Sequence, residues 1–434
     1  MSDPALLALV LGCFLVLLLF RVPVAFALGL ASFAFFFASG RPALSVVQKI
    51  ATQMAEPTLL AIPFFILCGE IMSSGGMARR LVDVANVCVG FVRGGLAMVN
   101  VVASMFFGGI SGSSVADTAS IGPVLIPTMV RSGYDRGFSV AVTIASSTQG
   151  IILPPSHNAI LYSLAAGGTV SIQALFLAGY VPGLLVGAAL MTLSAVVASR
   201  RGYPRGEIVS SRQALRIAAS GVPALVTPLI IVVPLALGWA PAHQSAIIAV
   251  VWSIIASSFI YRSLGAADYW RVLKRASRTS GIVIILIGTA AAFGEALTYL
   301  HVPEILAAAL TAISSQRVVV LLLLNVMILA LGAIMDMAAL IVILTPILLP
   351  VVEPLGVDPV QFGIILLLNL GIGLCTPPVG STLFVGCAVG EISIEEASRA
   401  LMPFYVAMLV VLILVTFIPE LSLWLPDLVA SWRS

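Results

Sequence analysis

The sequence is short of charge and of histidine. Of its 434 residues only 9% are Asp, Glu, Lys or Arg and three are His, whereas 60% are hydrophobic and the mean hydropathy is +1.16. A soluble domain of this length could not hide so much apolar surface, so we predict an all-α protein that crosses a membrane many times. The net charge of +3 is spread along the chain. It lacks the concentrated basic face that a nucleic-acid partner would require.

Motifs for catalysis are also missing. There is no His-Glu-x-x-His, no nucleophile elbow and no Walker loop, which disfavours a membrane enzyme. The cysteines are odd in number and scattered without metal-ligand spacing, so we interpret them as small buried hydrophobes: Cys13, Cys68, Cys88, Cys375 and Cys387. The first apolar run, 4–20, has no basic residue before it and no small-residue cleavage site after it, and we expect a retained helix.

Glycine and serine interrupt one long apolar run. Residues 108–118 read Gly-Gly-Ile-Ser-Gly-Ser-Ser-Val-Ala-Asp-Thr, and Pro123 and Pro127 follow closely. Non-helical backbone at membrane depth is tolerated only where protein encloses it or where it lines a watery cavity. An aspartate at that depth costs about 2.5–3.5 kcal/mol and usually marks an ion or substrate path. We therefore predict the tip of a re-entrant hairpin, spanning about 95–130.

Punctuating residues recur 223 positions apart. The pairs are Gly109 and Gly332, Pro123 and Pro346, Pro127 and Pro350, Gly133 and Gly356, Asp135 and Asp358, Gly150 and Gly373, Pro154 and Pro377, and Pro155 and Pro378. This repeat predicts a second hairpin, about 316–355, with its tip at 331–336. It also predicts two broken helices, about 135–166 and 358–390. We assign the first repeat to 1–200 and the second to 201–434.

Basic clusters orient the chain. Arginines crowd 200–216 and basic residues recur at 262–278, so both stretches are expected in the cytoplasm. Counting from them gives ten crossings, two hairpins and both termini outside. The crossings are near 4–20, 22–38, 57–74, 135–166, 172–199, 222–238, 243–261, 281–299, 358–390 and 397–419. Residues 41–56, 77–92 and 303–313 are expected to lie in the interface. The two repeats are then inverted, which is typical of secondary transporters.

Each hairpin tip is predicted to meet the Pro-Pro break of its own repeat. An interior Pro-Pro frees backbone carbonyls, which suit a hard cation, while half-helix N-termini suit an anion. In the first repeat the candidate residues are Ser111, Gly112, Ser113, Ser114, Asp117, Gly150, Pro154, Pro155, Ser156, His157 and Asn158. In the second they are Gly332, Asp336, Asn369, Gly373, Thr376, Pro377, Pro378 and Gly380. The sodium candidates among them are Ser111, Ser113, Gly150, Gly332, Asp336, Gly373 and Thr376.

Simpler interpretations stay open for several of these residues. The prolines could only kink their helices, Asp117 and Asp336 could cap half-helices, and His157 could be satisfied within the bundle. Asn369, one turn before Gly373, is a better ligand candidate than the other lone amide, Asn325. For Glu70 and Glu295, which follow glycines in the two repeats, structural pairing is favoured over an ion-relay role.

These residues resemble the large membrane subunit of the tripartite ATP-independent periplasmic (TRAP) transporters. The most specific parts are 108–117, 150–156, 332–336 and 376–380. The resemblance implies a sodium-driven importer of C4-dicarboxylates, sialic acids or other sugar acids in a bacterial inner membrane, with no other cofactor. It also implies a periplasmic binding protein, a small four-helix membrane subunit and an elevator motion. His157 departs from the aliphatic residue expected there and argues against assuming a plain dicarboxylate.

Two other transport classes compete with this interpretation. A channel is disfavoured, because inverted broken helices with enclosed hairpins suit alternating access better. A stand-alone sodium/carboxylate transporter is the nearer alternative, since inverted-hairpin folds can work without a binding protein. The sequence alone leaves the transported acid and the number of sodium ions open.

Overall fold

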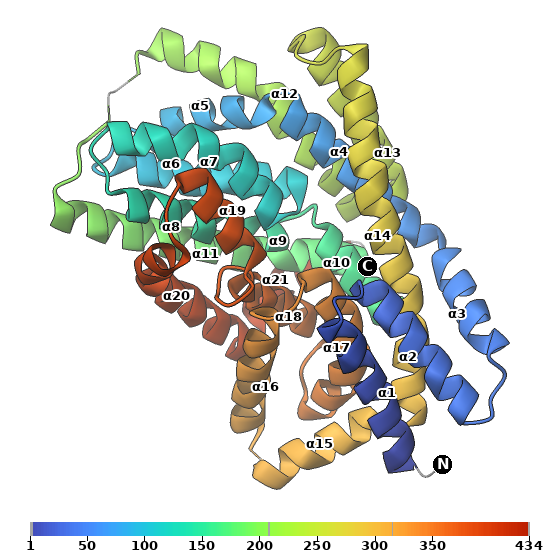
Figure 1. Ribbon diagram of the computed structural model, residues 1–434. Helices are drawn as coiled ribbons and strands as arrows, with labels where there is room; N and C mark the ends of the chain where they lie inside the picture. The colour runs from blue at the N-terminus through green and yellow to red at the C-terminus, as the bar shows by residue number, and fades with distance from the viewer. Residues whose placement is uncertain (1–2, 207–208, 315, 433–434) are drawn as a thin grey trace.

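The chain folds into helices throughout the part that the structure describes. The computed structural model describes residues 3–206, 209–314 and 316–432, and within them the helical class is confirmed, with no strand element (Figure 1). The helices of the first half are α1 (Asp3–Leu19), α2 (Val24–Ala38), α3 (Leu44–Met54), α4 (Ala61–Ser74), α5 (Met77–Val89), α6 (Gly95–Ser111), α7 (Ser114–Arg131), α8 (Arg136–Ser147), α9 (Gln149–Ile152), α10 (His157–Ala165) and α11 (Ile172–Arg201). Those of the second half are α12 (Ser211–Leu237), α13 (Ala242–Ile255), α14 (Ala266–Tyr299), α15 (Val302–Ile313), α16 (Arg317–Gly332), α17 (Met337–Val352), α18 (Pro359–Gly373), α19 (Ser381–Gly390), α20 (Ile394–Phe417) and α21 (Glu420–Ser431).

Three short helical segments extend these elements. A 3₁₀ turn, η1 (Pro57–Leu60), leads into α4, and another, η3 (Glu353–Leu355), follows α17. A π-helical segment, η2 (Ala256–Ile260), continues α13. The predicted hairpin segments correspond to the helix pairs α6–α7 and α16–α17 with η3, and the predicted broken helices correspond to α8–α10 and α18–α19. The bounds agree within a few residues.

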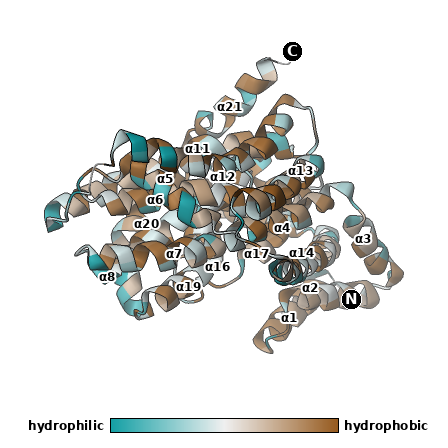
Figure 2. Ribbon diagram, turned by 90° about the horizontal axis from the view of Figure 1, so that it is seen from above, coloured by the Kyte–Doolittle hydropathy of each residue, from teal (hydrophilic) through white to brown (hydrophobic). Residues whose placement is uncertain are grey.

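The long helix α14 separates an outer arm from the main body. Helices α2, α3 and α4 all pack against it, and α1 packs on α2. Seen from above, α1, α2 and α3 lie on one side of α14, while α5 to α7, α11 and α20 lie on the other (Figure 2). Helix α17, the second arm of the second hairpin, also contacts α14. Helix α14 is thus the element against which the hairpin region meets the arm.

The two halves of the chain interlock. Helix α7 of the first hairpin packs on α19, which follows the break of the second half, and α17 of the second hairpin packs on α10, which follows the break of the first. A buried hydroxyl pair, Ser114 Oγ and Thr382 Oγ1 at 2.7 Å, joins α7 to α19. The second arm of each hairpin therefore packs against the other half of the chain.

Helix length and hydropathy identify candidate membrane spans. Among the described residues seven helices are long and apolar enough to cross a membrane, or eight if the α8–α10 run, bent by 50°, counts as one span. Several apolar helices of 10–17 residues fall below that length, so the ten crossings stay a prediction. Helices α1 and α2 have only 17 and 15 residues, because Pro23 divides the first apolar run. Helices α18 and α19 are short as well. Helix α17, predicted as a hairpin arm, is together with η3 long and apolar enough to span a membrane.

Helices also continue where loops were expected. The predicted spans 222–238 and 281–299 are parts of α12 and α14, which begin at Ser211 and Ala266 within the basic stretches. Arginine and lysine are good helix formers, so charge marks the end of the apolar part and not of the helix. Helix α21 was not predicted.

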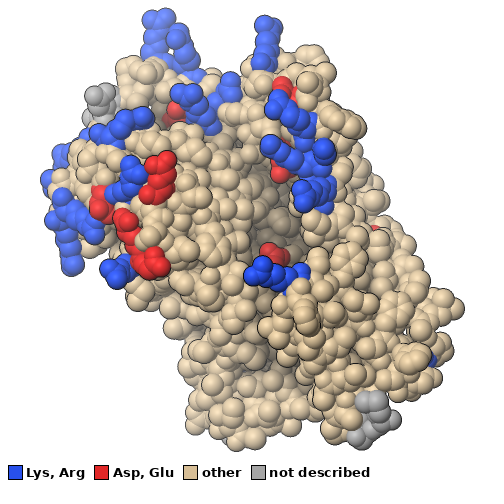
Figure 3. Space-filling view, viewed as in Figure 1, with Lys and Arg blue, Asp and Glu red and all other residues tan. Residues whose placement is uncertain are grey.

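Basic side chains gather over the upper part of the face in Figure 3, while its lower part is nearly bare of charge.

Candidate functional site

The first hairpin tip is a turn of two residues. Helix α6 ends at Ser111, Gly112 adopts a left-handed conformation with φ of +62°, and Ser113 begins α7 as its N-cap. The Ser113 hydroxyl accepts a hydrogen bond from the Ala116 amide at 3.3 Å. Glycine is required at 112 for a second reason as well, because a Cβ there would lie 2.9 Å from His157 Nδ1.

The first break lies directly against this tip. Residues 153–156, between α9 and α10, are buried, and Asn158 Nδ2 donates a hydrogen bond to the Gly112 carbonyl at 3.1 Å. The backbones touch at two glycines, since a Cβ on Gly108 would lie 2.4 Å from Gly150 Cα. The Ser156 hydroxyl donates to the Ile151 carbonyl, one of the groups that the break removes from the helical ladder. The structure thus brings together the tip and break residues of the first half.

The second tip and break repeat this arrangement. Asp336 is the N-cap of α17, and its Oδ2 accepts from the Ala338 amide at 3.0 Å. The Val379 amide donates to the Ala333 carbonyl at 3.0 Å, which ties the break to the tip. A Cβ on Gly373 would lie 2.6 Å from the Gly332 carbonyl carbon. Both X-Pro bonds, Pro154–Pro155 and Pro377–Pro378, are cis.

Oxygen atoms converge at the second break. The Thr376 hydroxyl donates to the Ile372 carbonyl at 2.8 Å and keeps its lone pairs as acceptors. Gly380 closes the break through its amide, which donates to the Thr376 carbonyl at 3.2 Å, and Tyr405 donates to the Cys375 carbonyl. Carbonyl and hydroxyl oxygens are the ligands that a hard monovalent cation prefers.

The two aspartates are not equivalent. Ser113, and not Asp117, is the residue 223 positions before Asp336, and both Ser113 and Asp336 cap the second arm of their hairpin. Asp117 lies inside α7 and is fully buried. Among the described residues no donor makes a hydrogen bond of normal geometry to either of its carboxylate oxygens. The hydroxyls of Ser104 and Ser147 approach it. The capping alternative therefore describes Asp336, whereas Asp117 is a buried carboxylate in need of a partner.

A buried hydroxyl network surrounds Asp117 and was missed from the sequence. Asn100 Nδ2 donates to Thr143 Oγ1 at 2.6 Å, Ser104 pairs with Ser146 at 3.0 Å, and Thr118 pairs with Ser147 at 2.7 Å. The signal was present, since α8 and α9 carry a polar run in an otherwise apolar setting: Ser139, Thr143, Ser146, Ser147, Thr148 and Gln149, all buried.

The lone amides pair with one another. Asn369 Nδ2 donates to Asn325 Oδ1 at 2.9 Å, and Asn325 Nδ2 donates to Thr416 Oγ1 at 3.1 Å. The Asn369 side chain thereby links α18 to α16. Glu295 pairs with Lys49 at 3.4 Å, as the structural interpretation of that residue expected.

Known proteins resemble this chain over nearly its whole length. Residues 11–421 match the family model described as the tripartite ATP-independent periplasmic transporter, DctM component. The uncharacterized protein YgiK of Salmonella typhimurium is 43% identical over 96% of this chain and 97% of its own. The C4-dicarboxylate TRAP transporter large permease protein DctM of Pseudomonas aeruginosa is 39% identical over 88% of this chain and 90% of its own.

Other relatives are named for different substrates and differ in length. The isethionate TRAP transporter permease protein DctMQ of Oleidesulfovibrio alaskensis is 38% identical over 97% of this chain, which spans 66% of the length of that relative. Among solved structures, the YdaH transporter of Alcanivorax borkumensis matches with a TM-score of 0.64 at 15% identity, covering 86% of each chain. This last likeness concerns the fold alone.

Proposed function

Since the chain belongs to the DctM family, the large permease component of the TRAP transporters, we propose that it is the translocation subunit of a sodium-coupled importer of organic acids. It is a multi-pass membrane protein, and we assign it to the bacterial inner membrane. One observation carries the proposal. Each hairpin tip is hydrogen-bonded to the break of its own half, through Asn158 in the first and Val379 in the second.

The coupling ions are proposed to bind where tip and break meet. In the first half the shell comprises the hydroxyls of Ser111 and Ser113, the Asp117 carboxylate and carbonyls near Gly150. The close backbone approach of Gly108 to Gly150 supports this, because a cation held by backbone oxygens needs two chain segments close together. A cation near Asp117 would also supply the partner that its buried carboxylate lacks.

The second shell is proposed from the equivalent contact. It comprises Gly332, Asp336 and Thr376 with carbonyls near Gly373. The Asp336 cap uses one carboxylate oxygen, and the other is left for an ion. The half-buried Thr376 and the exposed Asp336 make this shell the more accessible of the two.

The substrate is proposed to be an organic anion held between the two tips. The names of three relatives give C4-dicarboxylate, isethionate and sialic acid as substrates, and all three are anions. Half-helices α10 and α19 begin beside the breaks, and helix N-termini attract negative charge. His157 and Asn158 open α10 and are the proposed substrate contacts of the first half.

Partners and motion follow from the same proposal. The family name describes three components, and the longer relative DctMQ contains sequence beyond the part that this chain matches. We assign to this chain a small membrane subunit and a periplasmic binding protein as partners. The hairpins and broken helices would move together, elevator-like, against α14 and the arm.

Reconstitution tests the proposal. The chain with its small subunit is placed in proteoliposomes, and uptake of labelled succinate, sialic acid and isethionate is followed against an inward sodium gradient. Uptake is expected only when the cognate periplasmic binding protein is added in loaded form. Sodium-driven uptake of the free acid would favour the stand-alone transporter, and non-saturating flux would favour a channel.

A further inference from the structure

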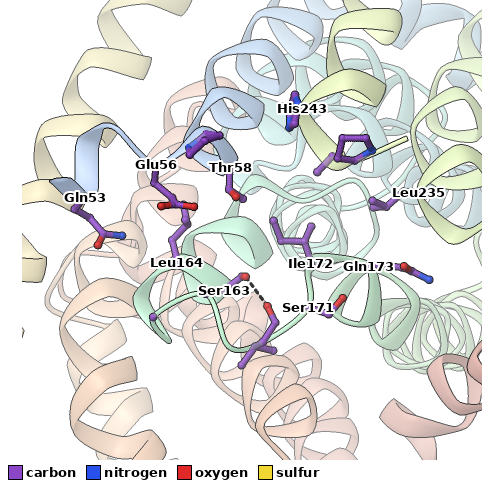
Figure 4. A pocket seen from close by; sticks show the side chains of 16 residues that line it. Gln53, Glu56, Thr58, Ser163, Leu164, Ser171, Ile172, Gln173, Leu235 and His243 are labelled. Atoms are coloured by element: carbon purple, nitrogen blue, oxygen red, sulfur yellow. Dashed lines mark hydrogen bonds between the residues drawn. The ribbon is translucent and has the colours of Figure 1, made fainter. Parts of the chain in front are cut away.

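A cleft opens between the arm and the hairpin region, apart from the tips and breaks. It consists of two adjoining cavities of about 580 and 320 Å³ that share Gln53, Leu164 and Gly167 among their lining residues. In Figure 4 the side chains of Gln53, Glu56 and Thr58 lie opposite those of Ser163 and Leu164 in the larger cavity. Its rim includes Gly167, Gly168 and His243, which belong to segments that the charge pattern orients outside.

A polar stripe leads down one side of the cleft. Lys49 and Gln53 are one turn apart on α3 and so share a face, and Glu56 follows just beyond the helix end. Glu56 and Gln53 line the larger cavity, while Gln53 and Lys49 line the smaller one. The neighbouring face of α3 is used for packing, since Ile50 and Met54 contact Gly288 of α14.

The stripe ends at an ion pair beside the second hairpin. Lys49 Nζ lies 3.4 Å from Glu295 of α14, with 44% and 28% of the two side chains exposed. Lys49 is the one lysine or arginine among the described residues that line either cavity. The far wall is formed by Val342 and Pro346 of α17, the arm that begins at Asp336. An anion that reached Lys49 would therefore already touch the helix leading to the second tip.

We propose that this cleft is an outer holding site for the organic anion, in which a substrate carboxylate displaces Glu295 and pairs with Lys49. The inference rests on the proposed function, because it takes the cargo to be an anion that arrives from outside. A half-exposed pair stabilises a protein little, so exchanging its carboxylate for another costs little. Among its described lining residues the cleft carries one lysine, Lys49, and two carboxylates, Glu56 and Glu295, so an incoming anion would compete with Glu295 for Lys49.

The first test measures the potential in the cleft and needs no substrate. The five native cysteines are replaced by alanine, Gln53→Cys is added, and the protein is reconstituted in sealed proteoliposomes. Outside anionic and cationic methanethiosulfonate reagents should both label it. Lys49→Gln should lower the ratio of anionic to cationic rates about threefold, and Glu295→Gln should raise it about as much. No labelling from the outside, or a ratio insensitive to both changes, would overturn the proposal.

The second test measures transport. Lys49→Gln should raise the KM for uptake about threefold with kcat unchanged, and Glu295→Gln should lower it, because it frees Lys49. Lys49→Arg should keep the wild-type KM. Arg201→Gln, which breaks a similar exposed pair with Asp135 at 3.4 Å outside the cleft lining, is the matched control and should change nothing.

The direction of the two KM changes distinguishes an anion site from a purely structural ion pair. If Lys49→Gln and Glu295→Gln both raise KM, or both lower the thermal midpoint alike, the pair is a brace between α3 and α14 and the proposal is wrong. If no organic acid is transported under any condition, the proposed function fails, while the labelling rates still report whether the cleft is open and governed by Lys49.

Discussion

The two tip–break units carry the same sequence pattern in opposite surroundings. In the first unit residues 153–156 are all buried. Gly69 of α4 lies against Ser111, where an added Cβ would be 3.3 Å from the Ser111 Cα, and Gly179 of α11 faces the Ile152 carbonyl. In the second unit Pro377 and Pro378 are exposed, and Ile334 and Val379 expose 56% and 47% of their surface. The motif sets the local backbone, and the neighbouring helices set the access.

This difference separates two tasks. Helices α4 and α11 cover the first unit, where buried hydroxyls beside Asp117 pair with one another, Ser104 with Ser146 and Thr118 with Ser147. The second unit meets open space, where ions and solutes can arrive. We therefore expect changes in the first unit to act mainly on folding and changes in the second to act mainly on exchange with solvent and ions.

The largest effect is expected from an added methyl group at the glycine contacts. Gly108→Ala would put a Cβ 2.4 Å from the Gly150 Cα, a backbone atom, whereas Gly332→Ala, at the position related by the repeat to Gly109, would first meet the flexible Leu370 side chain at 3.2 Å. Overpacking of a tight core costs about 1–3 kcal/mol. The thermal midpoint in detergent should fall strongly for Gly108→Ala and little for Gly332→Ala.

The control for this pair is Gly281→Ala in α14, where no atom lies within 4 Å of the new Cβ and alanine favours the helix. Its midpoint should stay level or rise. Equal losses for Gly108→Ala and Gly332→Ala would contradict the expectation that the Leu370 side chain gives way more easily than the backbone of Gly150.

The next effect concerns thiol access at positions 223 residues apart. In a cysteine-free background, Val379→Cys should react with a small charged thiol reagent at least about tenfold faster than Ser156→Cys, because only an accessible thiolate reacts. The measurement is the labelling rate of purified protein in detergent, where both sides are reachable. Similar rates at the two positions would mean that the first break is often exposed to solvent and that α4 and α11 cover it only part of the time.

A smaller effect is expected on sodium dependence. Thr376→Val removes a hydroxyl ligand proposed for the open unit, and losing such a ligand should weaken apparent sodium affinity about tenfold. Thr345→Val is the matched control, since Thr345 also donates to the carbonyl four residues before it but lies within α17. Uptake against sodium concentration at fixed binding protein separates them. Equal curves for both variants would remove Thr376 from the coupling site.

The smallest effect should be the same in both halves. Asp135 and Asp358 cap α8 and α18 at repeat-related positions, accepting from Phe138 at 2.8 Å and Val360 at 2.7 Å. Asp135→Ala and Asp358→Ala should each destabilise by about 1 kcal/mol. The added pair of Asp135 with Arg201 is exposed and contributes little. Thermal midpoints that differ widely between the two variants would show that the halves are not equivalent even at their caps.

The sequence predicted the places where the backbone departs from a helix, because glycine and proline report local geometry directly. Gly112 needs a left-handed conformation, and Pro154 and Pro377 begin breaks that no straight helix could contain. Asp135 and Asp358 recur at the same offset, but their roles as N-caps were not predicted.

What the sequence could not predict depends on distant contacts. The unequal roles of Asp117 and Asp336 follow from register within α7 and α17, and the pairing of Asn369 with Asn325 follows from how α16 meets α18. Exposure of the second break depends on which helices cover it. The ion pair of Lys49 with Glu295 joins residues 246 positions apart that no local pattern connects.

The hydroxyl contact between Ser114 and Thr382 has a consequence for biosynthesis. The two residues are 268 positions apart, and ribosomes add about 5–20 residues per second, so α7 leaves the ribosome roughly 13–54 s before its partner helix exists. During that interval its buried face, with the Asp117 carboxylate, must be sheltered by lipid or by the insertion machinery. The nascent first half is thus an unfinished protein, and the last quarter of the chain completes it.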